Sequence, residues 1–271
     1  MSFAPKIFGI VNITSDSFSD GGRFLAPEAA IAHARKLVAE GADVIDLGPA
    51  SSNPDAAPVS PQTEIARIAP VLEALHGEGV AVSLDSYQPE TQAYGLAHGV
   101  AYLNDIRGFP DAAIYPALAA SSARLVVMHS IQQGQADRRA APEGDIIDHI
   151  SRFFEERIAE LEAAGIARAR LILDPGMGFF LGPTPATSLT VLARFGELKA
   201  RFALPVLISV SRKSFLRALT GRAPGKAGAV SLAAELQAAQ NGADFVRTHE
   251  PAPLKDGLAV LSALKDSARI R

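Results

Sequence analysis

The stretch Leu171-Ile-Leu-Asp-Pro-Gly-Met-Gly178 is a short apolar run that stops at an aspartate and a glycine-containing turn. The chain repeats this arrangement eight times, with polar residues at or just beyond the end of each apolar run. The other runs are residues 7–11 before Asn12, 44–47 around Asp46, 80–84 before Asp85, 101–103 before Asn104, 125–128 before His129, 206–210 before Ser211, and 245–246 before Arg247. Such runs predict parallel strands that are buried on both faces.

Segments of helical length and amphipathic pattern separate these runs. They are residues 27–40, 61–75, 89–98, 111–120, 145–164, 187–202, 214–219, 230–240 and 254–268. Strict alternation of strand and helix predicts a parallel sheet, and eight units predict an α/β fold of the (β/α)8 type, a TIM barrel. An open, doubly wound sheet of six units is the alternative. No linker divides the chain, so we expect one domain over residues 1–271, with the polar segments 14–23 and 49–58 as mobile lids over the carboxyl ends of the strands.

The bulk properties agree with a small-molecule enzyme. The chain has 271 residues, close to the roughly 250 residues of one such barrel. A net charge of −3 gives no indication of nucleic acid or a membrane surface as a partner, and the absence of cysteine excludes disulfides and cysteine-bound zinc. Residues 7–13 include Asn12 and lack the features of a signal peptide, and no run is long enough for a membrane span. We therefore expect a soluble, cytoplasmic protein.

Three polar residues and a lysine at the strand ends predict a pocket for a polar heterocycle. Asp85, Asn104 and Asp174 end the third, fourth and sixth strands, and Lys213 follows the seventh. Their oxygens can accept hydrogen bonds from an aminopyrimidinone ring, and the lysine can donate to its nitrogens or carbonyl group. Because Asp and Asn also cap helices, a structural role is the alternative for each of them.

A second group of residues favours phosphate binding. Arg247 and His249 end the eighth strand, in a region where barrels frequently bind phosphate. Arginine gives a forked donor and histidine a second one, although an Arg–Asp structural pair in the barrel mouth is the alternative. Asn12 ends the first strand, and its amide oxygen suits Mg²⁺ beside a phosphate. Ser211 and Lys213 point the same way if their segment is extended.

These motifs together resemble the dihydropteroate synthase family over nearly the whole chain. They are Gly9-Ile-Val-Asn-Ile-Thr-Ser-Asp-Ser-Phe-Ser-Asp-Gly-Gly22, Ala42-Asp-Val-Ile-Asp-Leu-Gly48, Leu84-Asp-Ser-Tyr87, Asn104-Asp-Ile106, Leu173-Asp-Pro-Gly-Met-Gly-Phe179, Ser211-Arg-Lys-Ser-Phe215 and Arg247-Thr-His249, in the order of the family. The resemblance implies condensation of 6-hydroxymethyl-7,8-dihydropterin pyrophosphate with p-aminobenzoate, giving 7,8-dihydropteroate and pyrophosphate. It also implies a homodimer and Mg²⁺ as cofactor.

The resemblance assigns a role to each matched residue. It implies that the pterin is bound by Asp85, Asn104, Asp174 and Lys213. Pyrophosphate would be bound by Asn12, which would also be a ligand of Mg²⁺, and by Ser52, Arg247 and His249. The p-aminobenzoate pocket would be formed by Ser52, Phe179, Phe180, Ser211 and Lys213. The residues expected to carry catalysis are Asp85, Asp174, Lys213, Arg247 and His249.

Two segments depart from the family pattern, and both should border the p-aminobenzoate pocket. The second loop reads Ala50-Ser-Ser-Asn-Pro-Asp55 where the family usually has Glu-Ser-Thr-Arg-Pro-Gly, so the role of Asn53 is open. The segment after the sixth strand, Gly178-Phe-Phe-Leu-Gly182, has an added aromatic residue and no lysine, and Ser15 replaces a proline. These departures are similar to the acquired sulfonamide-resistant branch. We hypothesise that Phe180 narrows the pocket against bulky sulfonamides; filling the core is its alternative role.

Two other functions are compatible with this kind of barrel. Methyl transfer from methyltetrahydrofolate to a corrinoid protein would use the same Asp and Asn pterin site, but it needs no pyrophosphate site at Ser211, Arg247 and His249. A pterin-binding protein without catalysis is the third possibility, and Asn53 is the residue that leaves it open. Release of pyrophosphate distinguishes the synthase from both.

Overall fold

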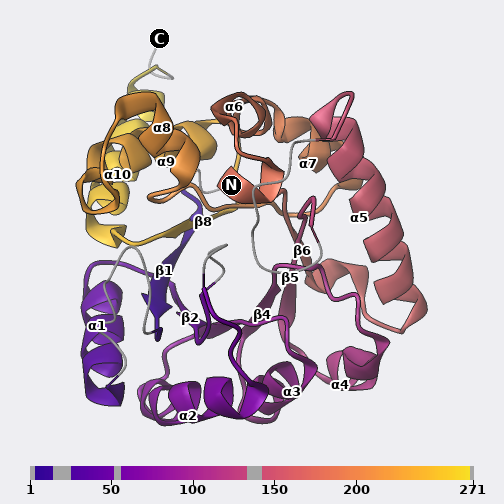
Figure 1. Cartoon of the computed structure of the whole chain (residues 1–271). Helices are drawn as coiled ribbons and strands as arrows, with labels where there is room; N and C mark the ends of the chain where they lie inside the picture. Colours follow the sequence, from indigo (N-terminus) through magenta and orange to yellow (C-terminus); the bar gives the residue numbers. More distant parts are fainter. Residues whose placement is uncertain (1–3, 15–25, 52–55, 133–141, 269–271) are drawn as a thin grey trace.

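The computed structural model describes residues 4–14, 26–51, 56–132 and 142–268, and these residues form one barrel of eight parallel strands ringed by helices (Figure 1). The strands are β1 (Lys6–Asn12), β2 (Val44–Gly48), β3 (Val82–Asp85), β4 (Tyr102–Asp105), β5 (Arg124–Met128), β6 (Leu171–Asp174), β7 (Leu207–Ile208) and β8 (Phe245–Thr248). Their order is β6-β5-β4-β3-β2-β1-β8-β7. A parallel bridge between Leu173 and Val206 joins β6 to the start of the seventh strand and closes the ring. The predicted barrel is therefore confirmed, and the open sheet is excluded.

The helices fall where the sequence predicts them, with differences at a few ends. They are α1 (Pro27–Ala39), α2 (Pro61–Gly77), α3 (Pro89–Ala97), α4 (Tyr115–Ala120), α5 (Ile146–Ala163), α6 (Pro185–Arg194), α7 (Gly196–Phe202), α8 (Ser214–Thr220), α9 (Gly228–Gln240) and α10 (Pro251–Ala268). Proline occupies the first turn of several of them, where its missing N–H costs nothing. The Ser60 hydroxyl caps α2 by accepting a hydrogen bond from the Thr63 amide at 3.2 Å.

Three predicted boundaries were wrong. The single helix expected over residues 187–202 is interrupted at Phe195, next to Gly196, a poor helix former, and gives α6 and α7. The helix expected over 111–120 begins as a 3₁₀ turn, Ala112–Ile114, before α4. The apolar run 206–210 forms ladder pairs only at β7, because the chain turns at Ser211 and Arg212 into α8.

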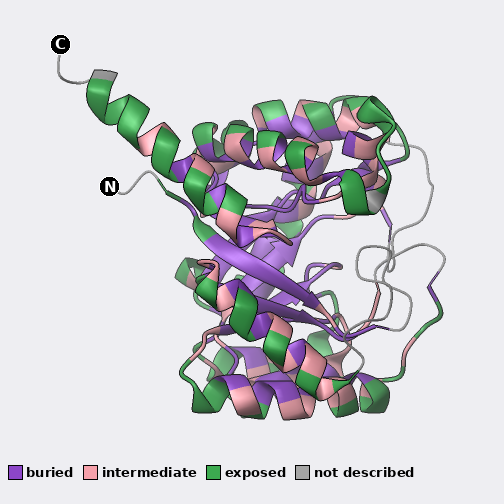
Figure 2. Cartoon of the chain, turned by 90° about the vertical axis from the view of Figure 1, so that its left-hand side faces the viewer, coloured by how far each residue is buried: buried purple, intermediate pink, exposed green. Residues whose placement is uncertain are grey.

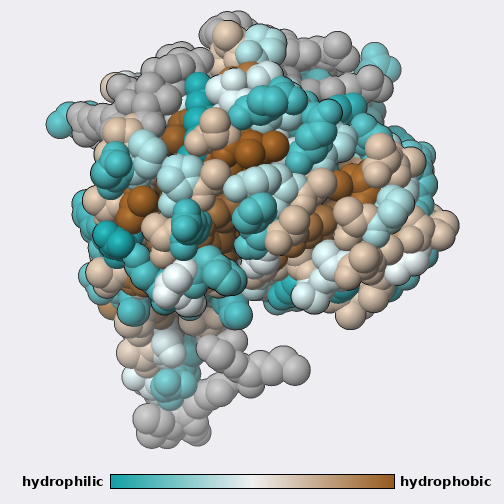
Figure 3. All heavy atoms as spheres, turned by 90° about the horizontal axis from the view of Figure 1, so that it is seen from below, coloured by the Kyte–Doolittle hydropathy of each residue, from teal (hydrophilic) through white to brown (hydrophobic). Residues whose placement is uncertain are grey.

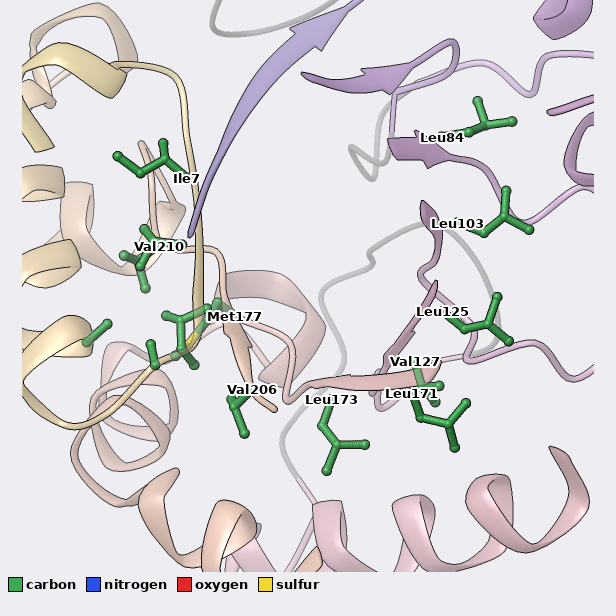
Figure 4. Close-up of a cluster of buried hydrophobic side chains, with 14 of the residues drawn as sticks. Ile7, Leu84, Leu103, Leu125, Val127, Leu171, Leu173, Met177, Val206 and Val210 are labelled. Atoms are coloured by element: carbon green, nitrogen blue, oxygen red, sulfur yellow. The ribbon is translucent and has the colours of Figure 1, made fainter. Parts of the chain in front are cut away.

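Two apolar layers hold the barrel together. Inside, Phe8, Tyr102 and Phe245 pack edge to face with ring centroids 5.0–6.3 Å apart, a geometry that aromatic pairs favour. Outside, strand side chains such as Leu84, Leu103 and Leu173 point toward the helices (Figure 4). This alternation gives each strand one set of residues for the helices and one for the barrel interior.

On the face seen in Figure 3, apolar atoms are visible in several places across the middle, with hydrophilic atoms among and around them. The last turns of α10 extend beyond the body of the barrel (Figure 2). On them Val260 and Leu264 are 60% and 61% exposed, and Leu219 at the end of α8 is 54% exposed. No helix in the described part of the chain is both long enough and apolar enough to span a membrane.

Candidate active site

The residues that face the barrel interior change from apolar to polar along each strand. The interior layer consists of Phe8, Val44, Tyr102, Val126, Ile172, Leu207 and Phe245. Because side chains alternate along a strand, the residues two and four positions further point into the same interior, nearer the carboxyl ends. Most of these positions hold polar residues or glycine, with Ile10, Ile106 and Met128 as the exceptions, and the polar ones include Asn12, Asp46, Asn104, Asp174, Ser209, Ser211, Arg247 and His249. The apolar layer therefore closes the barrel below a polar mouth, which is the end where such barrels carry their sites.

Arg247 lies at the centre of this mouth between two carboxylates. Its Nε donates to Asp46 Oδ2 and its Nη2 to Asp85 Oδ2, both at 2.5 Å. The Asp46 side chain is fully buried, and those of Arg247 and Asp85 are 14% and 16% exposed. The two carboxylates raise the pKa of Arg247 against the opposing effect of burial. The Arg–Asp pair that the sequence left as an alternative is thus present, and the sequence interpretation assigned no role to Asp46.

Burial sets the protonation of the acids around this arginine. It raises the pKa of Asp85 to about 7, although Arg247 and Lys213 oppose the change and Asp46 adds to it. It also raises the pKa of Asp174 to about 6, opposed first by the Gly176 amide, which donates to Oδ1 at 2.8 Å. Groups with such altered pKa values in a cleft are typical of functional sites.

Lys213 lies between this polar group and an apolar wall. Burial, and then the charge of Arg247, lower the pKa of Lys213 to about 8, against the effect of Asp174 and Asp85. Its Nζ is 5.3 Å from the centre of the Phe180 ring, within range of a cation–π interaction. Phe180 is only 4% exposed and packs in one cluster with Ile106 and Met128. The cluster provides an apolar surface for the flat ring of a ligand, beside charged hydrogen-bond donors and acceptors.

Asn104 offers an acceptor that the described residues leave unused. The residue is 2% exposed and pairs with Asp85 in the ladder between β3 and β4. Its Oδ1 is buried and has no hydrogen-bond partner among the described residues. Because a buried polar atom of this kind is costly, a ligand donor at this position would stabilise the site.

Ser211 and His249 meet at the ends of the seventh and eighth strands. Ser211 Oγ is 2.9 Å from His249 Nδ1 and accepts a hydrogen bond from the His249 backbone amide at 3.2 Å. Behind them, on α9, Glu235 is buried, and burial raises its pKa to about 7 against the effect of the Thr248 and Ser211 hydroxyls. The sequence analysis missed Glu235, because nothing but its charge in an otherwise small and apolar helix face points to it.

Asn12 and Gly48 lie side by side at the ends of β1 and β2. A Cβ atom added to Gly48 would be 3.1 Å from Asn12 Oδ1, so the glycine leaves room for that amide. Among the described residues no group of three His, Asp or Glu side chains could hold a metal ion. An amide oxygen with substrate phosphates and water is nevertheless a usual environment for Mg²⁺, so Asn12 fits that role. Ser52, Asn53 and Ser15 lie outside the described residues.

His129, to which the sequence gave no role, is completely buried. Its Nδ1 is 3.1 Å from the Pro175 carbonyl oxygen, and burial lowers the pKa of the ring to about 3. The ring is therefore neutral and supports the turn that follows β6. This position favours a structural role.

Comparison with known proteins first identifies the family to which the chain belongs. Residues 8–249 match the family of pterin binding enzymes, so the chain belongs to that family. It is 78% identical to the type-2 dihydropteroate synthase of Escherichia coli over 265 residues, which is 98% of both chains. It is 53% identical to the type-1 enzyme of Escherichia coli over 261 residues, 95% of this chain and 93% of the relative.

Solved structures agree. A Yersinia pestis dihydropteroate synthase in complex with a sulfonamide drug superposes with a TM-score of 0.91 at 33% identity, covering 97% of this chain and 94% of the other. The Xanthomonas albilineans enzyme in complex with 7,8-dihydropteroate gives a TM-score of 0.82 at 33% identity, covering 96% and 93%. Within the pterin-binding family the chain is therefore a dihydropteroate synthase, similar to the acquired type-2 branch.

Proposed function

We propose that this enzyme joins 6-hydroxymethyl-7,8-dihydropterin pyrophosphate to p-aminobenzoate, and that its barrel mouth binds the two substrates side by side. The observation that carries the proposal is the group of buried or half-buried acceptors and one half-buried donor around the mouth: Asp85, Asn104, Asp174 and Lys213. An aminopyrimidinone ring presents donors for the first three and acceptors for the lysine. The unused Asn104 Oδ1 supports this assignment most directly.

The same residues would assist departure of pyrophosphate. The bond between the pterin methylene carbon and the pyrophosphate oxygen breaks, and its electron pair leaves with the pyrophosphate. Arg247 and His249 would donate to the leaving oxygens, where fixed donors stabilise developing charge. Asn12 would be a ligand of Mg²⁺, which supplies further stabilisation of that charge, and Ser52 would contact the phosphate.

Ionised carboxylates complete the reaction. An ionised Asp85 or Asp174 would stabilise the positive charge that develops on the pterin as the methylene loses its leaving group. The nitrogen of p-aminobenzoate then forms the new C–N bond and loses one proton to solvent. Arg247 is paired with Asp46 and Asp85, so pyrophosphate would compete with these two carboxylates for the guanidinium group. We infer that substrate binding exchanges this internal ion pair for contacts with the two substrates.

Steady-state formation of dihydropteroate from the two substrates tests the reaction. We expect pyrophosphate release that depends on p-aminobenzoate. Methyl transfer, or pterin binding without catalysis, would release no pyrophosphate. The proposal would therefore be overturned if the complete assay released no pyrophosphate. Repeating the assay with a sulfonamide in tenfold excess over p-aminobenzoate tests whether the drug inhibits the enzyme.

We propose further that Phe180 makes this enzyme insensitive to sulfonamides. The side chain is buried against Ile106 and Met128 and lies near Lys213, so it narrows the pocket from inside. The backbone of the same turn is held by a hydrogen bond from the Ile131 amide to the Phe180 carbonyl oxygen at 3.1 Å. A fixed wall can admit a flat carboxylate and exclude a tetrahedral sulfonyl group with a further substituent. Phe179 and Ser211 would line the rest of the p-aminobenzoate pocket.

Removing one phenylalanine tests this wall. Because Phe179 and Phe180 are adjacent, deleting either gives the same chain, which lacks the added aromatic residue. We expect the inhibition constant of sulfamethoxazole to fall far more than the KM of p-aminobenzoate changes. Phe180→Leu, which keeps a buried apolar side chain, serves as the matched control for Phe180→Ala. Equal changes of the two constants would show that Phe180 only fills the core.

We also propose that the enzyme works as a cytoplasmic homodimer. The exposed apolar side chains of Leu219, Val260 and Leu264 support a subunit contact through α8 and α10. Light scattering after gel filtration gives the mass directly, and a mass of one chain at micromolar concentration would contradict the dimer.

A further inference from the structure

Gln92 is a buried amide on the inner face of α3. Only 1% of the residue is exposed. One helical turn further along, a Cβ added to Gly95 would lie 2.5 Å from Leu84 Cδ2, so the helix packs closely against β3. An apolar side chain is the usual choice at such a position, because a buried amide costs stability unless its hydrogen bonds are satisfied. The partners of Gln92 therefore indicate what this amide does.

The amide nitrogen of Gln92 joins two loops of the barrel mouth. Nε2 donates one hydrogen bond to the Ser86 carbonyl oxygen and one to Asp105 Oδ2, both at 2.8 Å. Because both partners are acceptors, they fix the orientation of the amide and use both of its hydrogens. Ser86 directly follows Asp85, and Asp105 directly follows Asn104. A single nitrogen atom thus links the residues next to two of the proposed pterin ligands.

Ser86 is also held at its other polar atoms. Its backbone amide donates to the Asn104 carbonyl oxygen at 3.1 Å, which ties the loop after β3 to β4. Its hydroxyl donates to Glu64 Oε2 on α2 at 2.6 Å and accepts a hydrogen bond from the Gln88 amide at 3.1 Å. The position of Ser86, and with it that of the preceding Asp85, therefore depends on contacts from α2, α3 and β4.

The carboxyl group of Asp105 divides its two oxygens between Gln92 and the turn after β4. Oδ1 accepts a hydrogen bond from the Arg107 amide at 2.7 Å, and the Asp105 carbonyl oxygen accepts one from the Gly108 amide at 3.0 Å. Burial raises the pKa of Asp105 to about 6, and the hydrogen bonds from the Arg107 amide and from Gln92 oppose this change. The carboxyl group is thus mostly ionised at neutral pH, and a buried carboxylate needs such donors.

The link lies where the two strands separate. Asp85 and Asn104 form the last pair of the ladder between β3 and β4. Beyond this pair the ladder no longer fixes the distance between the two chain segments, and Gln92 bridges them one residue further on. An error of about 1 Å in the placement of a reacting group can cost about 100-fold in rate. A bridge at this point therefore affects how both side chains meet a ligand.

We propose that Gln92 is a positioning residue for the pterin, because its amide sets the spacing between Asp85 and Asn104 by joining the loops that follow them. Both hydrogens of the amide are used by Ser86 and Asp105, so Gln92 acts through these residues and not by contact with the substrate. The inference rests on the proposed function, since it takes Asp85 and Asn104 as pterin-binding residues.

Gln92→Met tests this role, because methionine is unbranched and adaptable but lacks a hydrogen-bond donor. In calorimetric titration with 6-hydroxymethyl-7,8-dihydropterin, the pterin without its pyrophosphate, we expect a dissociation constant at least about tenfold higher than that of the unaltered enzyme. Ser211, proposed for the p-aminobenzoate pocket, follows β7, across the ring from β3 and β4. The KM of p-aminobenzoate should therefore stay within about twofold. Equal changes of the two constants, or an unchanged dissociation constant, would overturn the inference.

Gln88→Met is the matched control. Gln88 lies on the same loop, and its Nε2 donates to the Val59 carbonyl oxygen at 3.0 Å. The control loses one amide–carbonyl hydrogen bond but keeps the link between Ser86 and Asp105, so the pterin should bind within about twofold of the unaltered enzyme. A loss as large as that of Gln92→Met would show that any loosening of this loop weakens binding, and Gln92 would then have no special role.

Gln92→Glu gives a second readout, which loss of packing alone would not produce. The introduced carboxyl group can donate to the Asp105 carboxylate when protonated and repels it when ionised. The pterin affinity of this variant relative to the unaltered enzyme should fall by at least about tenfold between about pH 6 and about pH 9, while the KM of p-aminobenzoate shows no such trend. The other charged or titratable groups around Asp105 are Arg107, Asp85 and Tyr87, and both proteins contain them. A relative affinity that does not change with pH would contradict the bridge.

Failure of the inference and failure of the proposed function are distinguishable. If Asn104→Ala binds the pterin as tightly as the unaltered enzyme, the proposed pterin site is wrong. If Asn104→Ala binds it at least about tenfold more weakly, as loss of one buried hydrogen bond predicts, but both variants of Gln92 bind it normally, only the inference about Gln92 is wrong.

Discussion

We expect the ionised carboxyl group of Asp85 to lower the free energy of unfolding, whereas the proposed reaction needs it. The substitution Asp85→Asn separates the effect on stability from the effect on activity. The Asp85 carboxyl group lies beside Arg247, and burial raises its pKa to about 7 in spite of that arginine. Because the pKa in the folded state exceeds the ordinary value, ionising Asp85 opposes folding. Asparagine keeps the shape and one acceptor for Arg247 but carries no charge.

The size of the effect follows from the two pKa values. The interval between the ordinary value of about 3.9 and about 7 corresponds to about 4 kcal/mol. The penalty is absent below about pH 4, grows as the pH rises, and is complete above about pH 7. It amounts to about 1–2 kcal/mol near pH 5 and about 4 kcal/mol near pH 8. The advantage of Asp85→Asn over the unaltered enzyme should therefore grow by about 2–3 kcal/mol between these pH values.

Urea denaturation of the two proteins without substrate, at about pH 5 and about pH 8, measures this change directly. Any pH-independent loss of the hydrogen bond to Arg247 cancels in the comparison. Dihydropteroate formation should fall by at least two orders of magnitude, because the proposed contact of Asp85 with the pterin and its stabilising charge would be lost. A variant that becomes less stable relative to the unaltered enzyme as the pH rises would show that the ion pair with Arg247 outweighs burial, and would refute the reasoning.

Two further substitutions examine the parts that hold this site. Arg247→Lys should lower the free energy of unfolding by about 2–3 kcal/mol in chemical denaturation, because a lysine cannot bridge Asp46 and Asp85 with a planar fork; an unchanged midpoint would contradict this. Gly176→Ala should lower it by about 2 kcal/mol or more, since the residue has a φ of 73° and its new Cβ would lie 2.3 Å from the His129 carbonyl oxygen; a melting temperature equal to that of the unaltered enzyme would show that the turn can adapt.

The fold could be predicted from the sequence because each strand and helix carries a local pattern. Apolar runs with a polar end, proline at helix starts and glycine after helix ends are all visible without knowledge of tertiary contacts. The break at Phe195 has a local mark in Gly196 that our prediction of one helix did not weigh, whereas the short ladder of β7 could not be predicted, because it depends on how that segment pairs with its neighbours. Local pattern determines which elements form, whereas tertiary packing determines where several of them end.

The candidate site was predictable only as far as its residues stand at strand ends. Asp85, Asn104 and Asp174 terminate their runs, so the sequence marks them. Asp46 lies two residues after Val44 on the same interior side of β2, and a single acid inside an apolar run has no marker except that side chains alternate. Glu235 has no marker of this kind in the sequence, because Thr248 on β8 and Ser211 on the turn after β7 are brought near α9 only by closure of the barrel. Asp46 adds to the raised pKa of Asp85, so a residue that affects the protonation of the site is one that the sequence conceals, since its effect depends on burial and on charges from several elements.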